Sequence, residues 1–188
     1  MQFNINDTKL ETRNPKLRIL GIDPGSRITG YGVIEVQGNR STYLVSGCVR
    51  VDDETFPERL RAIFDGIGAV VAEYQPTEIA IEKVFVQRNV DSALKLGQAR
   101  GAAICAVMNR SLPIAEYSPA QIKLALVGRG AADKHQVQHM VKTLLQLVES
   151  PQADAADALA CALCHSHTRQ TLNALPAAVR GMRGGRWR

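Results

Sequence analysis

Four acidic residues stand where two strand-like segments end and where one helix-like segment begins. Asp23 follows one short apolar run, and Glu82 ends another. Asp154 and Asp157 are three residues apart, a spacing that puts both on one face of a helix. Carboxylates brought together stay ionised only if cations lie between them, and hard oxygen ligands favour Mg²⁺ or Mn²⁺. The pattern therefore predicts a nuclease that uses two metal ions.

Three of these acids also have an ordinary structural interpretation. Asp23 precedes a Pro-Gly pair, where aspartate is common in turns. Asp154 suits the N-cap of a helix, and Asp157 suits a first turn, where the helix dipole favours an acid. Glu82 is harder to explain in this way, because an acid that ends the apolar stretch Ile79–Ile81 is unusual. The functional interpretation depends on all four acids together.

The residue pattern predicts an α/β layered domain, with a mixed sheet and helices on both of its faces. The predicted strands are Leu17–Ile22, Gly30–Val36, Thr42–Val49, Glu78–Glu82 and Ile114–Tyr117. The predicted helices are Phe56–Tyr74, Ser92–Asn109 with Ser92 as N-cap, Pro119–Val127, Asp133–Leu147 and Asp154–His167. If the strands that carry Asp23 and Glu82 are parallel neighbours, both carboxylates emerge at one edge of the sheet.

Length and composition fit one ordinary globular domain. The chain has 188 residues, of which 45% are apolar and 22% are charged, which argues against general disorder and collagen. The longest apolar run, Ala102–Met108, is far shorter than the ~20 residues of a membrane span. The first 15 residues hold no apolar stretch typical of a signal peptide. We expect a cytoplasmic protein whose four cysteines are reduced.

The net charge of +5 is concentrated at the C-terminal end. Residues 170–188 hold four arginines and no acid, a composition that suits nucleic acid as well as a disordered solubilising tail. We expect an extension over residues 1–16, a nuclease domain over 17–168 and a basic tail over 169–188, with both ends flexible.

The sequence resembles the RuvC Holliday junction resolvases, a family of ribonuclease H-like nucleases. The resemblance runs from about Leu17 to Thr168. Its motifs are Leu20–Arg27 with Thr29–Gly32, Ile81–Phe85, Asp91–Gly101, Gln136–Met140 and Pro151–Leu159. It implies the ribonuclease H-like fold, a five-stranded mixed sheet flanked by helices on both faces. It also implies a homodimer that nicks two opposed strands of a four-way DNA junction in recombination and repair.

The resemblance assigns the four acids to the metal site. It implies that Asp23, Glu82, Asp154 and Asp157 hold two Mg²⁺ ions, for which Mn²⁺ substitutes. One ion then activates water and the second stabilises the leaving 3′ oxygen, which leaves 5′-phosphate and 3′-hydroxyl ends. The partners implied are four-way junction DNA, a second copy of the chain and a RuvA–RuvB branch-migration complex.

Further residues are candidates for DNA contacts. Phe85 resembles the family aromatic that stacks on junction bases, with a core phenylalanine as the alternative. Lys123 and Lys134 match family lysines near the active site, with solvated lysines as the alternative. The candidates for backbone phosphates are Arg88, Lys95 and Arg100, for which a plain solvated face is the alternative.

Two glycines in the helix Ser92–Asn109 indicate close approach of another backbone. Gly97 and Gly101 lie four residues apart, and each glycine costs ~1 kcal/mol of helix stability relative to alanine. The approaching backbone is either the sheet of the same chain or a twin helix across a two-fold axis. The family resemblance favours the twin helix.

Other functions compete with junction cleavage. A related nuclease for another branched or hybrid nucleic acid, or a non-catalytic junction-binding protein, would share the fold. Gly21–Gly25 also matches the first phosphate loop of actin-like ATPases, but no second such loop follows.

The cysteine motif is set aside as a cofactor signal. Cys161, Cys164 and His165 spell the haem-attachment motif, but a chain without a signal peptide does not suit it. We interpret Cys161 and Cys164 as partly buried thiols on a helix face, and Cys48 and Cys105 as core residues.

Overall fold

The computed structural model describes residues 16–51, 55–84, 89–108 and 110–174. Its centre is a five-stranded mixed sheet in the order β3-β2-β1-β4-β5. The strands are β1 (Leu17–Asp23), β2 (Ile28–Gln37), β3 (Arg40–Arg50), β4 (Glu78–Glu82) and β5 (Ile114–Tyr117). The helices are α1 (Phe56–Tyr74), α2 (Val90–Met108), α3 (Pro119–Val127), α4 (Lys134–Leu144) and α5 (Ala153–Ala174). The predicted α/β class and mixed sheet are confirmed.

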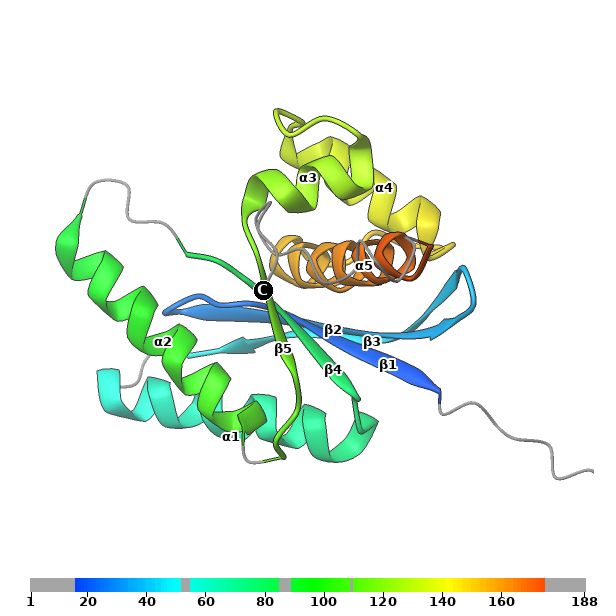
Figure 1. The fold of residues 1–188 in the computed structure, drawn as a ribbon. Helices are drawn as coiled ribbons and strands as arrows, with labels where there is room; N and C mark the ends of the chain where they lie inside the picture. The colour runs from blue at the N-terminus through cyan, green and yellow to red at the C-terminus, as the bar shows by residue number, and fades with distance from the viewer. Residues whose placement is uncertain (1–15, 52–54, 85–88, 109, 175–188) are drawn as a thin grey trace, which may run out of the picture.

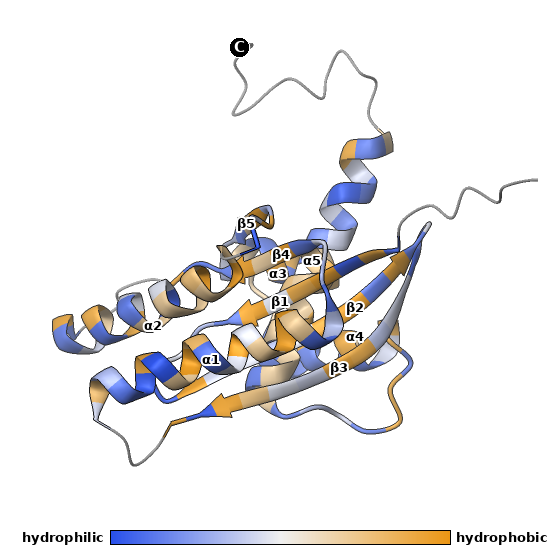
Figure 2. Ribbon diagram, turned by 90° about the horizontal axis from the view of Figure 1, so that it is seen from below, coloured by the Kyte–Doolittle hydropathy of each residue, from blue (hydrophilic) through white to orange (hydrophobic). Residues whose placement is uncertain are grey.

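Helices cover both faces of the sheet. Figure 1 shows α1 and α2 on one face and α3, α4 and α5 on the other. Each face has its own core. The core under α1 and α2 includes the fully buried Leu20, Ile22 and Ile81, while the core under α5 includes Ile19 and Ile34. Successive residues of β1 therefore point to opposite cores, as the two-residue period of a strand requires. Figure 2, which looks onto α1 and α2, shows apolar and polar positions mixed along both helices.

Strand β1 has one antiparallel and one parallel neighbour. It pairs antiparallel with β2 and parallel with β4, and β4 pairs parallel with β5. The β2–β3 hairpin turns at Gly38, whose φ of 60° lies in the left-handed region that favours glycine. In the β1–β4 register Ile22 lies opposite Ile81, so the next residues, Asp23 and Glu82, end two adjacent parallel strands together.

Three predicted helix boundaries were wrong, and one of them is the end of α4, which is Leu144 rather than Leu147. Helix α2 begins at Val90 rather than Ser92, because the Asn89 side-chain oxygen accepts hydrogen bonds from the amides of Asp91 (3.0 Å) and Ser92 (3.3 Å). Asn89, not Ser92, is therefore the N-terminal cap. Helix α5 continues beyond the predicted end at His167 to Ala174. Arg169 pairs there with Glu78 of β4, so this turn of the helix is still attached to the sheet.

The predictions for the cysteines were correct only in part. Cys161 and Cys164 are buried on α5, more deeply than expected. Cys48 is partly buried on β3, whereas Cys105 is exposed on α2, so its prediction as a core residue was wrong. The reason is that Cys105 lies on the face of α2 that points away from α1 and the sheet. No helix in the described ranges is long and apolar enough to cross a membrane.

Candidate active site

The ends of β1 and β4 bring two acids to one edge of the sheet. Asp23 is the last residue of β1 and Glu82 is the last residue of β4. Because these strands are parallel neighbours, both side chains emerge at the carboxyl ends of the strands, as the sequence pattern predicted. Three preceding isoleucine and alanine positions in β4 are fully buried and hold this edge in place.

Three glycines of β1 and β2 let α5 pack directly on the sheet. A Cβ atom on Gly21 would lie 2.0 Å from the backbone oxygen of Ala158, and one on Gly30 would lie 2.1 Å from the backbone oxygen of Asp154. A Cβ on Gly32 would lie 2.6 Å from the Leu159 side chain. These distances are far below van der Waals contact, so atoms of α5 occupy the space of the missing side chains, backbone atoms at Gly21 and Gly30 and the Leu159 side chain at Gly32.

This packing places the other two acids. Asp154 lies in the first turn of α5, directly over Gly30, which is the β2 partner of Asp23. Asp157 follows on the same side of the helix, and its side chain lines a pocket together with Glu82. The small residues around them, Ala155, Ala156 and Ala158, are buried, as close approach of helix and sheet requires.

Burial and the charges of nearby acids shift the pKa values of Asp23 and Glu82. Burial raises the pKa of Asp23 to about 8, and the charges of Glu82, Asp157 and Asp154 add to the effect. Burial also raises the pKa of Glu82 to about 7, with the Asp157 charge as the next cause. Lys134 lowers the pKa of both, and Lys123 also lowers the pKa of Glu82. Burial and the neighbouring acids thus raise both pKa values more than the lysines lower them.

Two predicted lysines line the carboxylate pocket. It has a volume of about 200 Å³, and Lys123 of α3 and Lys134 of α4 share it with Glu82 and Asp157. Lys134 Nζ lies 2.7 Å from Asp157 Oδ2, a hydrogen-bonded ion pair that raises the pKa of the lysine. Lys134 is the first residue of α4, next to the N-cap Asp133, whose side chain accepts from the Gln136 amide at 2.9 Å. The cap thus fixes the start of α4 and with it the position of the Lys134 side chain.

The donor set fits hard divalent cations. All four candidate ligands are carboxylates, and a bound cation would favour the ionised forms of Asp23 and Glu82, which burial disfavours. Within the described ranges, however, no three acidic, histidine or cysteine side chains form a cluster tight enough to hold one ion. The Lys134 ammonium lies on Asp157 instead.

The remaining DNA candidates lie elsewhere or outside the described ranges. Phe85 and Arg88 fall between residues 84 and 89, which the structure does not describe. Lys95 pairs with Asp91 on the outer part of α2 at 2.6 Å. Arg100 pairs with Glu116 of β5 at 2.5 Å, so it ties α2 to the sheet and does not reach the carboxylate pocket.

A buried polar network behind the site was missed in the sequence. The Tyr117 hydroxyl lies 2.7 Å from His165 Nδ1, and His165 Nε2 lies 2.7 Å from a Glu78 oxygen. Burial lowers the pKa of His165, which favours the neutral ring. Because a carboxylate only accepts, Nε2 carries the proton and Nδ1 accepts from Tyr117. The network ties α5 to β4 and β5. In sequence, only the apolar setting of His165 hinted at it.

Comparison with known proteins places the chain in a family. The family model described as "Crossover junction endodeoxyribonuclease RuvC" matches residues 19–165. The curated RuvC proteins of Shewanella loihica and Shewanella sediminis are each 59% identical over 170 residues, which cover 90% of this chain and 98% of theirs.

Solved structures agree with the sequence comparison. The structure of Thermus thermophilus RuvC in complex with a Holliday junction substrate has a TM-score of 0.78 and 35% identity, and the match covers 82% of this chain and 96% of that chain. The yeast mitochondrial Holliday junction resolvase Ydc2, at 12% identity and a TM-score of 0.59, shares the fold. The predicted ribonuclease H-like architecture is confirmed. From its sequence relatives and its fold together, this chain belongs to the RuvC family of crossover junction endodeoxyribonucleases.

Proposed function

We propose that this protein resolves four-way DNA junctions by paired, symmetric nicks of two opposed strands. The observation that carries the proposal is the approach of Glu82, Asp154 and Asp157 to Asp23, close enough for their charges to raise its pKa, in a chain that matches the family over residues 19–165. The relative solved with a Holliday junction has the same fold. The matched range also supports a nuclease domain over residues 17–168.

Members of this family are metal-dependent nucleases, and we assign the metal ligands to Asp23, Glu82, Asp154 and Asp157. Two Mg²⁺ ions, for which Mn²⁺ substitutes, would activate water and stabilise the leaving 3′ oxygen when bound. The lysines of the pocket hold the substrate. Lys123 and Lys134 present two cations beside Glu82 and Asp157, where they attract the scissile phosphate and orient it. Lys134, which pairs with Asp157 here, would be free to contact the phosphate if a cation held by Asp157 neutralised that carboxylate.

The protein acts as a homodimer that pairs through α2. An added Cβ on Gly97 or Gly101 would meet nothing within 4 Å, so these glycines do not face the sheet of their own chain. Leu94 and Met108, 62% and 52% exposed, lie on the same side of the helix as the exposed Cys105. The α2 helix of a second copy covers this apolar face, and that copy brings the second active site that two opposed nicks require. By family resemblance, a RuvA–RuvB complex delivers the junction in the cytoplasm.

The decisive experiment compares wild-type protein with Asp23→Asn on a mobile synthetic four-way junction in Mg²⁺. Linear duplex and RNA–DNA hybrid serve as substrate controls, and products are resolved on denaturing and native gels. We expect paired nicks that ligase seals, lost in Asp23→Asn while junction binding is kept. Binding without cleavage in any divalent metal would favour a non-catalytic junction-binding protein. Cleavage of the RNA–DNA hybrid alone would support the carboxylate site but contradict a four-way junction as the substrate.

A further inference from the structure

Helix α4 carries two histidines that the active site does not use. The chain has four histidines in all. His165 belongs to the buried network behind the active site, and the His167 ring lies 3.2 Å from the Ala125 carbonyl. The other two, His135 and His139, are exposed on α4. They are four residues apart, so both lie on one face of the helix.

The face that holds the two histidines points away from the protein. Val137 and Val141 are the buried residues of α4 and belong to the core under α5. Each histidine lies two positions before one of these valines, which is about 200° around a helix of 3.6 residues per turn. Figure 1 shows α4 beyond α5, on the side away from the sheet. The imidazoles of His135 and His139 are therefore accessible to ions in solution.

Two histidines at this spacing are a ligand pair for transition metals. Side chains at i and i+4 of a helix have Cβ atoms ~5–6 Å apart, so their imidazole nitrogens can hold one ion between them. Imidazole suits Zn²⁺ and Ni²⁺, whereas Mg²⁺ prefers oxygen ligands. In metalloproteases with two histidines at this spacing, a glutamate follows the first histidine and acts as the base, but here that residue is Gln136. The pair therefore indicates metal binding without hydrolysis.

The backbone that carries the pair is already helical without metal. The Asp133 side chain accepts from the Gln136 amide at 2.9 Å, and the Gln136 side chain accepts from the Asp133 amide at 3.1 Å. This reciprocal cap fixes the first turn of α4, so His135 lies one turn before His139. The two side chains can approach one ion without any change of the backbone.

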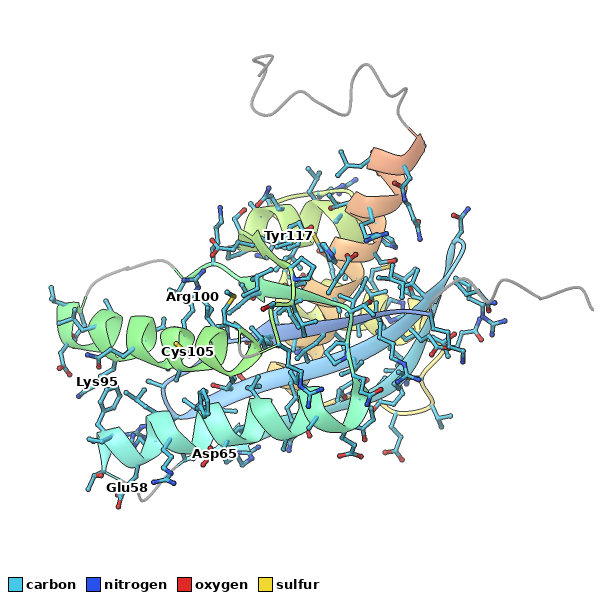
Figure 3. The ribbon with its side chains drawn as sticks, turned by 60° about the horizontal axis from the view of Figure 1, so that its bottom comes forward. Glu58, Asp65, Lys95, Arg100, Cys105 and Tyr117 are labelled. Carbon is cyan, nitrogen blue, oxygen red and sulfur yellow. The ribbon has the colours of Figure 1, made fainter. Side chains whose placement is uncertain are left out.

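The exposed thiol of the chain lies on a different part of the molecule. Of the four cysteines only Cys105 is exposed. Figure 3 shows Cys105 on α2, and Figure 1 shows α2 on the opposite face of the sheet from α4. Metal held by the α4 histidines is therefore separate from metal held by this thiol.

We propose that His135 and His139 together bind one late first-row divalent metal ion, Zn²⁺ or Ni²⁺, with water in its remaining positions. The proposal is independent of the proposed function, because neither histidine lines the carboxylate pocket. The bound ion links the first two turns of α4, the helix whose first residue, Lys134, lines that pocket. It stabilises the folded chain, since the unfolded chain does not hold two imidazoles at this spacing.

The test changes the spacing of the histidines and keeps their number. His135→Gln with Thr143→His leaves histidines at positions 139 and 143, again four apart, whereas His139→Gln with Thr143→His leaves them eight apart. Thr143 is exposed on α4. Binding of Ni²⁺ to the reduced, tag-free, full-length protein is measured by isothermal titration calorimetry in excess Mg²⁺, which competes for the carboxylates. Thermal unfolding with and without Ni²⁺ is the second measurement.

We expect wild-type protein to bind Ni²⁺ at this pair and to melt at a higher temperature in its presence. His135→Gln alone should weaken Ni²⁺ binding about a hundredfold, because a second ligand tethered to the first adds ~10²–10⁴ to the affinity. Adding Thr143→His to His135→Gln restores both the affinity and the thermal shift. The variant with histidines eight residues apart binds Ni²⁺ no more tightly than His135→Gln.

Either of two results overturns the metal site. Equal Ni²⁺ affinities of the two double variants would show that each imidazole binds metal singly. Wild-type protein that binds Ni²⁺ no more tightly than His135→Gln would show that the pair does not act together. Wild-type protein that binds Ni²⁺ as expected but does not nick the junction overturns the proposed function and leaves the metal site in place.

Discussion

Replacing Gly30 with alanine should separate the chemistry of this protein from its binding of DNA. Gly30 lies opposite Asp23 in the β1–β2 register and directly beneath the first turn of α5. The new Cβ would lie 2.1 Å from the backbone oxygen of Asp154 and 2.5 Å from its carbonyl carbon, whereas ordinary contact begins at 3.4 Å. The new Cβ is fixed to the backbone of β2 and the Asp154 carbonyl group belongs to the backbone of α5, so no side-chain rotation can relieve the clash. The first turn of α5 has to move away from the sheet.

The displacement required is on the order of 1 Å, and a misplacement of that size costs about 10²-fold in rate. We therefore expect Gly30→Ala to lower the nicking rate about a hundredfold. Overpacking of this kind destabilises a fold by roughly 1–3 kcal/mol, so the melting temperature should also fall. Junction affinity should change little, because the surfaces that meet the DNA backbone keep their charges.

The assay is single-turnover nicking of a four-way junction in Mg²⁺, with protein in excess and at a temperature well below the melting point of the variant. Gly68→Ala is the matched control. Gly68 lies within α1, where an added Cβ would meet nothing within 4 Å. That substitution should stabilise the helix by up to ~1 kcal/mol and leave nicking unchanged. The same change of residue type is thus made with and without a clash.

Two results would refute the reasoning. Wild-type nicking by a folded Gly30→Ala protein would show that close packing of α5 on β2 does not position Asp154. A parallel loss of nicking and junction binding would show that the substitution disturbs the DNA surface as a whole. A loss of nicking alone, with Gly68→Ala active, supports the placement of Asp154 by Gly30.

Three further predictions concern ionisation, the buried network and the dimer. Without metal ions, the stability of the fold should fall as pH rises from about 4 to 8. The reason is that folded Asp23, with a pKa of about 8, keeps a proton that the unfolded chain loses near 3.8. Thermal unfolding in EDTA should show this pH dependence, and Asp23→Asn should flatten it. Tyr117→Phe leaves His165 Nδ1 without its 2.7 Å partner and should cost ~1–3 kcal/mol in urea unfolding with little change in nicking; an unchanged midpoint would contradict the network. Gly97→Arg has room for its side chain within the monomer but not against a twin helix, so sedimentation should show a folded monomer, and a persistent dimer would exclude pairing through α2.

The carboxylate site could be predicted because its signals are local. Short apolar runs defined β1 and β4, and the acid at the end of each run marked the edge where it emerges. The boundaries of α1, β4, β5 and α3 matched the predicted ones, since capping residues and proline positions at their ends are themselves sequence signals. Parallel pairing of β1 with β4 was only a condition of that prediction, and the structure meets it.

What could not be predicted depends on contacts between distant residues. Asn89 caps α2 in place of Ser92, and either side chain suits the role until the backbone is placed. The last turns of α5 look like a polar tail in sequence, and only the pairing of Arg169 with Glu78 shows why the helix continues. Cys105 has an apolar setting in sequence, but it lies on the face of α2 that the chain itself leaves uncovered.

The glycines of β1 and β2 show how one set of residues determines both fold and site. Glycine weakens a strand, so Gly21, Gly30 and Gly32 are unfavourable by local propensity alone. The small alanines of α5 allow close packing, but the surface that receives the helix is recognised only when both partners are known. The helix that packs on these glycines also carries Asp154 and Asp157. The glycines therefore weaken β1 and β2, but they allow these two acids to lie near Asp23 and Glu82.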